Sequence, residues 1–474
     1  MSTIQRVAKN TGIIIVGDVI FKLISLIVVI YLARYLLPVE FGKYSFVFAY
    51  IAFFSVVPDL GLHAILVREM SRDLSIAPKL IGNAYIIRLI LAVFAVVLSM
   101  VIITLMSYPA DTTSYIYMAA FMLLFMSFSD LYTTIFRANL RMEYNIIAKL
   151  TSKVLSASLI LLIIFLHGTL MQVIIAQVFS ESIKMLISYL FSRKFVRPRF
   201  EIDFELWKHL VKEALPLALS SVIWVIYYQI DMVMLSLMKG DAAVGIYSAA
   251  HKLFEPLSLI PFALMMPLFP IMSEAFKAST EKLIKSYRLG LKYLLIIAIP
   301  FAIGIALLSN KIVLLIYGTE FANSATVLQI LICGLIFIFT NFVLLDLLIA
   351  IDKQKLNTFS MGLCAIVNVT LNLFFIPLLS YNGAAITTLI TNIILFLVSF
   401  YFVSKHLQVL SVHKIVTKPV IGGLIMGAFM YYFIDLNIIL LILLAGAIYL
   451  AVLFVLKEFQ KEDRDILKKI VSRK

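Results

Sequence analysis

The chain has 474 residues, of which 63% are hydrophobic and 14% are charged, and its formal net charge is +14. Soluble domains contain about 45–50% apolar and about 25% charged residues, so this composition excludes a soluble protein and indicates a polytopic membrane protein. The basic residues are spread along the chain and do not form one patch. This distribution argues against a nucleic-acid partner and favours contact with anionic membrane lipids.

Apolar stretches that can cross a bilayer follow one another along almost the whole chain. A spanning helix needs about 20 apolar residues, because lipid offers the backbone no hydrogen-bond partner. We therefore predict an all-α integral membrane protein with about fourteen transmembrane helices. The predicted helices are 12–33, 43–65, 82–107, 114–136, 145–166, 170–192, 212–238, 243–270, 289–309, 322–349, 356–379, 382–404, 416–434 and 438–456.

The loops between these helices alternate in charge. The segments on the side of the N-terminus, together with the span ends that adjoin them, hold 32 of the 40 Lys and Arg residues. The outward loops and their adjoining ends hold four, namely Arg34, Lys43, Lys239 and Lys311. The remaining four are assigned to the spans, namely Lys22, Arg88, Lys184 and Lys252. An excess of basic residues on alternate loops marks the cytoplasmic side. We predict a multi-pass protein of the plasma or inner membrane with both termini in the cytoplasm.

A repeat with an offset of 203 residues relates two parts of the chain. Gly42, Tyr44, Ser45 and Pro58 recur as Gly245, Tyr247, Ser248 and Pro261. The members of each pair lie at the same end of their predicted spans, so the repeat is parallel, about an axis along the membrane normal. We predict a first six-helix lobe at 1–195, an interfacial linker at 196–211 and a second lobe at 212–405. Two further transmembrane helices occupy 406–456, and a cytoplasmic amphipathic tail occupies 457–474.

Two segments give the chain a specific resemblance. One is RVAKNTGIIIVGDVIFKLISLIVVIYLARYLLPVEFGKYSFVFAY, followed by DLGLHAILVREMSRD, and the other is YYQIDMVMLSLMKGDAAVGIYSAAHKLFEPLSLIP. Both resemble the Wzx-type polysaccharide flippases of the multidrug/oligosaccharidyl-lipid/polysaccharide transporter superfamily. The resemblance implies two lobes around a central cavity that works by alternating access. It implies a substrate in which an oligosaccharide is joined through diphosphate to a polyprenyl lipid, moved from the inner to the outer leaflet, with glycan-assembly enzymes as candidate partners.

Ionisable residues inside the predicted helices are the candidate substrate site, because a charge at mid-membrane costs about 2.5–3.5 kcal/mol. Lys22 lies roughly 15 Å past the inner boundary of the first helix, which is too deep for its side chain to reach the surface easily. Asp18 lies four residues earlier on the same face and can pair with it. We predict that Lys22 binds the diphosphate as its counter-charge and that Asp18 positions Lys22.

The seventh and eighth predicted helices supply the other candidates. Asp231 lies within the seventh helix with Gln229 beside it, and we expect them to face the same cavity and to contact water, sugar or a cation. An acidic group there also allows coupling of transport to H⁺ or Na⁺. Lys252 and Glu255 in the eighth helix form either a local ion pair or a further part of the site. Both interpretations stay open at this point.

Arg88 and Lys184 lie within about eight residues of the inner surface, so we interpret them as anchors whose side chains reach the headgroups. The sequence contains no motif for a metal, a cofactor or a catalytic nucleophile, and the outward loops are too short to hold an active site. These observations predict a transporter and not an enzyme. The alternatives are a lipid II-type flippase, a MATE-like cation antiporter and, less favoured, a membrane-embedded glycan polymerase.

The predicted topology is testable by cysteine labelling. Single cysteines in the 107–113 and 380–382 loops, in a chain that lacks Cys333 and Cys364, should react with an impermeant thiol reagent from outside the cell, because these loops are predicted to face outward. Labelling of Ser192→Cys or Lys474→Cys from outside intact cells would contradict the assignment.

Overall fold

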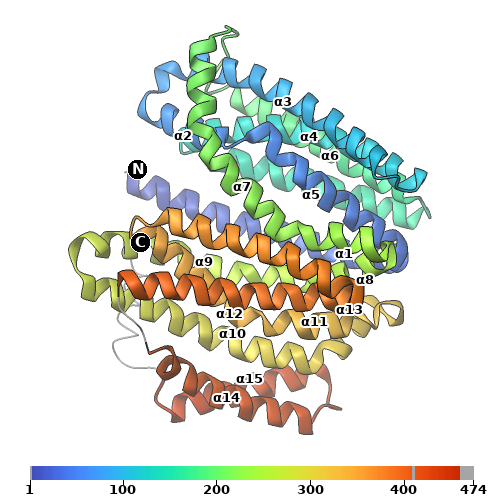
Figure 1. Cartoon of the computed structure of the whole chain (residues 1–474), viewed down its shortest axis with the longest axis vertical. Coiled ribbons are helices and arrows are strands. Elements are labelled where there is room, and N and C mark those ends of the chain that lie inside the picture. Colours follow the sequence, from blue (N-terminus) through green and yellow to red (C-terminus); the bar gives the residue numbers. More distant parts are fainter. Residues whose placement is uncertain (1–2, 408–410, 459–474) are drawn as a thin grey trace. The chain divides into compact units, whose positions relative to one another are not determined.

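The computed structural model describes residues 3–407 and 411–458, and within these ranges it contains helices and turns but no strand (Figure 1). Twelve helices in these ranges are long and apolar enough to cross a membrane. The predicted all-α membrane fold is therefore confirmed. The chain divides into two compact units, which meet in sequence between Gly245 and Ile246.

The first unit contains seven complete helices, the short helix η1 and the first turn of an eighth helix. Their bounds are α1 (Thr3–Asp59), α2 (Leu62–Arg72), η1 (Leu74–Ile76), α3 (Ala77–Leu105), α4 (Ala110–Ala138), α5 (Met142–Phe165), α6 (Leu170–Ser192), α7 (Phe204–Lys239) and α8 (Asp241–Phe254). The amphipathic helix α2 places Leu66 and Met70 in a buried cluster with Leu131 and Phe136 of α4. This cluster fixes α2 against the membrane-spanning helices.

The second unit contains the rest of α8 and the helices that follow it. Their bounds are η2 (Glu255–Ser258), α9 (Leu259–Ala278), α10 (Thr280–Tyr317), η3 (Thr319–Phe321), α11 (Ser324–Cys333), α12 (Leu335–Ala350), α13 (Gln354–His406), α14 (Val412–Tyr432) and α15 (Ile438–Val455). The last two helices pack on α10, where the Tyr449 hydroxyl donates to the Ile296 carbonyl at 2.8 Å. They occupy the segment predicted at 406–456, and almost all of the predicted amphipathic tail lies outside the described residues.

Two of the long helices are interrupted where the sequence predicts a loop. In α1, Leu37 precedes Pro38 and has non-helical angles of φ 61° and ψ 173°, because proline disfavours helical angles in the residue before it. In α13 the break lies at Ser380, with φ 52° and ψ −132°. Each of these helices therefore consists of two helices joined at a kink. The count of fourteen spans stays a prediction.

The repeat of 203 residues has a counterpart in the backbone. Gly240, which corresponds to Leu37, has φ 80° and ψ −178°, so the chain turns in the same way at both positions. A Cβ atom on Gly42 would lie 1.8 Å from the carbonyl oxygen of Asp241, and one on Gly245 would lie 1.9 Å from that of Pro38. In both cases the carbonyl belongs to the residue four positions before the partner glycine. The segments 38–42 and 241–245, both in the first unit, therefore meet in a reciprocal contact. The division into lobes at 1–195 and 212–405 stays a prediction.

The connection between α6 and α7 is held against the start of α3. Its irregular part ends at Asp203, so α7 begins earlier than the predicted span at 212. The Asp203 side chain caps α7 by accepting from the Leu206 N–H at 3.0 Å, and an ion pair of 2.6 Å joins it to Lys79. These two contacts, Lys79 first, hold the pKa of Asp203 below its ordinary value. The Trp207 indole donates to Asn83 at 2.7 Å, which fixes the first turn of α7.

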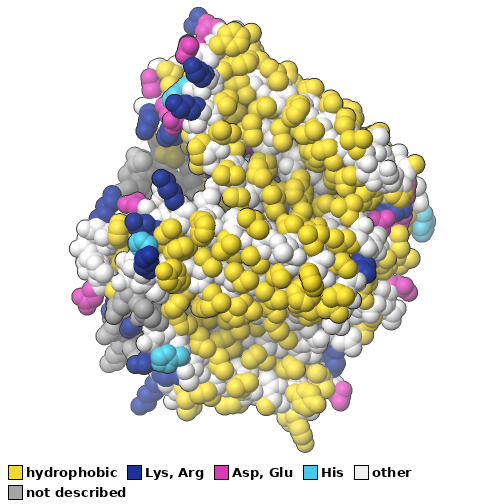
Figure 2. Space-filling model, in the orientation of Figure 1, with side chains coloured by type: hydrophobic (Ala, Val, Ile, Leu, Met, Phe, Trp, Pro, Cys, Tyr) yellow, Lys and Arg dark blue, Asp and Glu magenta, His cyan; other side chains and the backbone are white. Residues whose placement is uncertain are grey.

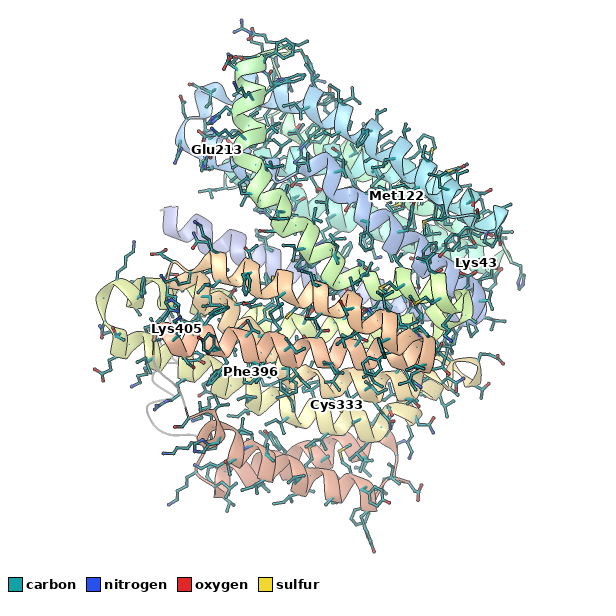
Figure 3. All side chains as sticks on the ribbon, viewed as in Figure 1. Lys43, Met122, Glu213, Cys333, Phe396 and Lys405 are labelled. Atoms are coloured by element: carbon teal, nitrogen blue, oxygen red, sulfur yellow. The ribbon has the colours of Figure 1, made fainter. Side chains whose placement is uncertain are left out.

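Side chains on the surface follow the pattern of a membrane protein. Within each unit hydrophobic side chains cover the sides of the helices and charged side chains gather at the helix ends (Figure 2). In the first unit Lys43 and Glu213 lie at opposite ends (Figure 3). Lys43, one of the few predicted outward bases, forms ion pairs with Glu40 at 2.7 Å and Asp111 at 2.5 Å. The protein is a multi-pass membrane protein.

The contact between the two glycines generates a prediction about stability. Gly42→Ala and Gly245→Ala should each destabilise the protein by about 1–3 kcal/mol, because the added methyl group meets a backbone carbonyl that cannot rotate away. Because both changes open the same contact, the double variant should lose less than the sum of the two single effects.

The measurement is the thermal unfolding midpoint of the purified protein in detergent. Gly446→Ala in α15 is the matched control, since a Cβ there would meet nothing within 4 Å. A decrease for the control as large as that for Gly42→Ala would contradict the account.

Candidate functional site

Helices α1 and α5 approach closely near the predicted Lys22 site. Gly17 is buried, and a Cβ atom on it would lie 2.6 Å from the side chain of Ile146, so a larger residue would require α1 or Ile146 to shift. One turn further along α5, the Lys149 ammonium donates to the Asp18 carboxylate at 2.6 Å. Both side chains are about one-quarter to one-third exposed, at 26% for Asp18 and 30% for Lys149. The pair therefore remains accessible from outside the helix packing.

Two lysines of α5 contact the ring of Phe21, close to Asp18. The Nζ atom of Lys149 lies 4.4 Å from the ring centroid and that of Lys153 lies 5.2 Å from it. Cations are attracted to the face of an aromatic ring, so Phe21 holds both ammonium groups beside α1. Lys22 follows Phe21 directly and is half-buried. We call Asp18, Phe21, Lys22, Lys149 and Lys153 the α1–α5 cluster.

The α1–α5 cluster extends the sequence prediction. Lys22 was predicted as the partner of Asp18, and the structure gives this carboxylate Lys149 as a partner. Lys149 and Lys153 are among the 32 basic residues that predicted the cytoplasmic side, and no other role was predicted for them. Their spacing of four residues places them on one face of a helix, which is the signal that could have indicated a shared role. The role of Lys22 in diphosphate binding stays a prediction.

The predicted residues of α7 lie in a more enclosed place. Asp231 is 5% exposed, and Gln229 is half-buried. Directly before Gln229, the ring of Tyr228 stacks on that of Trp224 one turn earlier, with the centroids 5.1 Å apart. Further along the helix the Tyr108 hydroxyl donates to Ser236 at 3.0 Å, which fixes α7 against the turn between α3 and α4. That Asp231 and Gln229 face the substrate stays a prediction.

Lys252 and Glu255 form a local ion pair in the second unit. The ammonium and carboxylate groups are 3.2 Å apart, and both side chains are about one-third exposed, at 34% and 30%. The pair lies where α8 ends and η2 begins, because Pro256 removes a backbone donor from the helix. Such an exposed pair contributes little to stability. The structure therefore contains the local ion pair that the sequence allowed. A contact of either residue with substrate stays a prediction.

The interpretation of Arg88 as an interfacial anchor was wrong. Its side chain is 0% exposed, and its guanidinium donates to the Ser127 carbonyl at 2.7 Å and to the carboxylate of Asp59. Arg88 therefore points into the helix packing and not toward the headgroups. The depth of a residue along its helix does not show which face it occupies, so α3 could not be oriented from sequence.

Asp59 is positioned by the turn between α1 and α2. Its carboxylate accepts from the N–H groups of Gly61 and His63, both at 3.2 Å, and so satisfies donors at the start of α2 that no helix carbonyl can reach. Lys184 was also interpreted as an anchor, and this was wrong as well. Its ammonium donates to Glu181 of its own helix at 2.5 Å, with the Lys184 side chain 20% exposed.

Residues 7–276, more than half of the chain, match a family model described as "Polysaccharide biosynthesis protein". The chain belongs to this family. Residues 216–374 also match the MatE model. The chain is thus related to the superfamily that the sequence resemblance indicated.

Individual relatives agree with this membership. The chain is 28% identical to the uncharacterized membrane protein MJ1068 of Methanocaldococcus jannaschii over 258 residues. The match covers 52% of this chain and 50% of that protein. It is 30% identical over 173 residues to the probable flippase AglR of Haloferax volcanii, which is 35% of each chain. The matched region thus spans half or less of these relatives' lengths.

A solved structure shares the fold over nearly its whole length. The chain is similar to the lipid II flippase MurJ in an inward closed conformation, with a TM-score of 0.79 and 16% identity. The similarity covers 95% of this chain and 99% of that chain. It shows a common arrangement of helices.

The burial of Arg88 generates a prediction about stability. Arg88→Ala should destabilise the protein by about 3 kcal/mol, because it leaves the Asp59 carboxylate and the Ser127 carbonyl without their donor. The thermal unfolding midpoint of the purified protein measures the effect. Arg72→Ala is the matched control, since Arg72 is 68% exposed in its pair with Glu69 and should cost less than about 1 kcal/mol. An equally small effect at Arg88 would contradict the buried ion pair.

Proposed function

We propose that the protein is a flippase that moves polyprenyl-diphosphate-linked oligosaccharide from the inner to the outer leaflet by alternating access. The match of more than half of the chain to the polysaccharide biosynthesis family carries this proposal. The relative AglR, which is named a probable flippase, and the shared fold with the lipid II flippase MurJ support it. The product would serve the assembly of a surface polysaccharide or glycan, with membrane lipids and glycan-assembly enzymes as partners.

The α1–α5 cluster supplies the charge that such a substrate needs. A diphosphate carries negative charge through the membrane, and ammonium groups stabilise it without forming a covalent bond. Lys22, Lys149 and Lys153 lie on two packed helices of one unit, where Lys149 pairs with Asp18 and the ammonium groups of Lys149 and Lys153 lie beside the ring of Phe21. A group of three lysines suits an anionic headgroup better than an organic cation. This favours a flippase over a MATE-like antiporter.

The orientation and the membrane follow from the charge of the loops. The excess of Lys and Arg on alternate loops supports both termini in the cytoplasm and a plasma or inner membrane location. A lipid II-type flippase fits the same cluster, because its substrate also contains a polyprenyl diphosphate. The two flippases differ in the glycan and not in the chemistry of the headgroup. Coupling to H⁺ or Na⁺ through Asp231 is part of the proposal.

Transport by variants of the α1–α5 cluster tests the proposal. Lys22→Ala should lower the flipping of a polyprenyl-diphosphate oligosaccharide in proteoliposomes more than about tenfold, because one lost ion pair to a phosphate is worth 1.4 kcal/mol or more. Lys22→Arg should retain part of the activity, since the positive charge survives. Lys149→Ala should also lower the rate, and it should remove the ion pair of Asp18 with Lys149.

The matched control is Lys212→Ala, which removes an exposed base from the start of α7. It should leave the rate unchanged. Protein amounts and unfolding midpoints of all variants must match the parent for the comparison to hold. Parental transport by Lys22→Ala would contradict its assigned role.

A further inference from the structure

A second group of charges lies in the first unit, at α4 and the helices that pack on it. Asp130 lies eight residues before the end of α4 at Ala138. The side chain of Asp130 is exposed, although the residues on either side in the sequence, Ser129 and Leu131, are fully buried. Within the described part of the chain its carboxylate has neither a hydrogen-bond donor nor an ion-pair partner. It is thus an open carboxylate inside a predicted membrane span.

The charges that act on Asp130 come from three other helices. Lys184 of α6 and Arg88 of α3 attract its negative charge, whereas Asp59 of α1 and Glu181 of α6 repel it. Both cations are already engaged, Arg88 with Asp59 and Lys184 with Glu181. These four charges cancel in pairs, so these four side chains together with the ionised Asp130 carry a net charge of −1.

His63 on α2 is a further titratable group near Asp130. A ring nitrogen of His63 lies 2.8 Å from the hydroxyl of Thr134, one turn after Asp130 on the same face of α4. The charges that act on His63 are those of Arg137, Asp59 and Arg88. The titratable and charged groups around Asp130 therefore come from α1, α2, α3, α4 and α6. Within the described structure, the carboxylates of Asp59 and Glu181 each have a basic or backbone donor, whereas that of Asp130 has none.

Buried polar atoms near Asp130 lack a hydrogen-bond partner among the described residues. Arg88 is 0% exposed, yet its Nε–H has no partner within the described residues, and the same is true of the hydroxyls of Ser127 and Ser129. Buried donors of this kind are normally satisfied by ordered water. A carboxylate that is accessible beside such atoms faces an internal polar space, because exposure to lipid would cost several kcal/mol. Asp130 can therefore exchange a proton with water.

We propose that Asp130 is a proton-binding site of the first unit. When a hydronium ion gives its proton to the carboxylate, an O–H bond of hydronium breaks, one Oδ–H bond forms and a water molecule is left. The net charge of the group then changes from −1 to zero, which a medium of low dielectric constant favours. A sodium ion would need several oxygen ligands at once. The carboxylates of Asp59 and Glu181 already bind cationic side chains, and the described residues contain no set of three acidic, His or Cys side chains placed around an ion. The ligand is therefore a proton.

The consequence for transport rests on the proposed function. A proton on Asp130 removes the excess negative charge from the packing of α1, α3, α4 and α6, and the α1–α5 cluster belongs to two helices of the same unit. Binding of H⁺ and binding of an anionic headgroup can thus favour the same conformation of the first unit. The proton site itself does not depend on what the protein transports.

Infrared spectroscopy of the purified full chain tests the proton site directly. A protonated carboxylic acid has a C=O stretching band that a carboxylate lacks, and this band should grow as the pH falls. Asp130→Asn should remove a band equivalent to about one carboxyl group per protein. Asp73→Asn, at an exposed turn of the same unit, is the matched control and should retain it. Asp130→Glu should keep a titrating band, which shows that the site folds with a different acid.

The neighbours of Asp130 supply a second readout. Lys184→Met should move the midpoint of the band by about one pH unit or more, to higher pH, because the carboxylate loses a cation that stabilises it. A band that persists unchanged in Asp130→Asn would overturn the proposal. So would a band that disappears at constant pH when K⁺ is replaced by Na⁺, since the site would then hold a metal ion.

The two proposals can fail separately. If the band behaves as expected while proteoliposomes move no lipid-linked oligosaccharide, the proton site stands and the proposed function fails. If transport occurs while the band is absent from the parent, the function stands and the proton site fails.

Discussion

A charge inside a membrane-spanning helix must meet an opposite charge, a hydrogen-bond donor or water, and this constraint arranges the first unit. Arg88 meets Asp59, Lys149 meets Asp18, and Lys184 meets Glu181. Two of these pairs join separate helices, so they fix both the spacing and the rotation of the helices that carry them. An unpaired charge in lipid costs several kcal/mol, so an arrangement of these helices that separated the pairs would be strongly destabilised.

The same constraint distinguishes charged groups that lie within the helix packing from charged groups that gather at a partly exposed place. Asp59 has an arginine and two backbone donors, and its role is complete within the fold. The ammonium groups of Lys149 and Lys153, in contrast, lie beside the ring of Phe21, next to Lys22 in the sequence, and Lys149 also pairs with Asp18. Basic groups gathered at a partly exposed place favour the binding of an oppositely charged ligand. The α1–α5 cluster is for this reason the part of the first unit best suited to an anionic headgroup.

The sequence predicted what depends on composition and on local backbone chemistry. Hydrophobic length located the membrane-spanning helices and predicted the loop in which the break of α1 lies, and the recurrence of Gly42 as Gly245 coincided with a reciprocal contact within the first unit. Hydrophobicity did not show the rotation of α3, because the apolar side chains there surround the helix, so Arg88 could not be assigned to the packed face. The partner of Asp18 lies 131 residues away on α5, and no local pattern links the two. Pairing across the fold is the part that needed the structure.

The central claim is that the protein moves an anionic lipid-linked oligosaccharide and recognises its diphosphate. The most direct measurement compares the flipping rates of three substrates in proteoliposomes that contain the parental protein. These are a polyprenyl-diphosphate oligosaccharide, the same lipid and glycan joined through one phosphate, and a fluorescent organic cation. The account predicts rapid movement of the diphosphate, a rate at least about tenfold lower for the monophosphate and no movement of the cation. Equal rates for the first two, or transport of the cation alone, would contradict it.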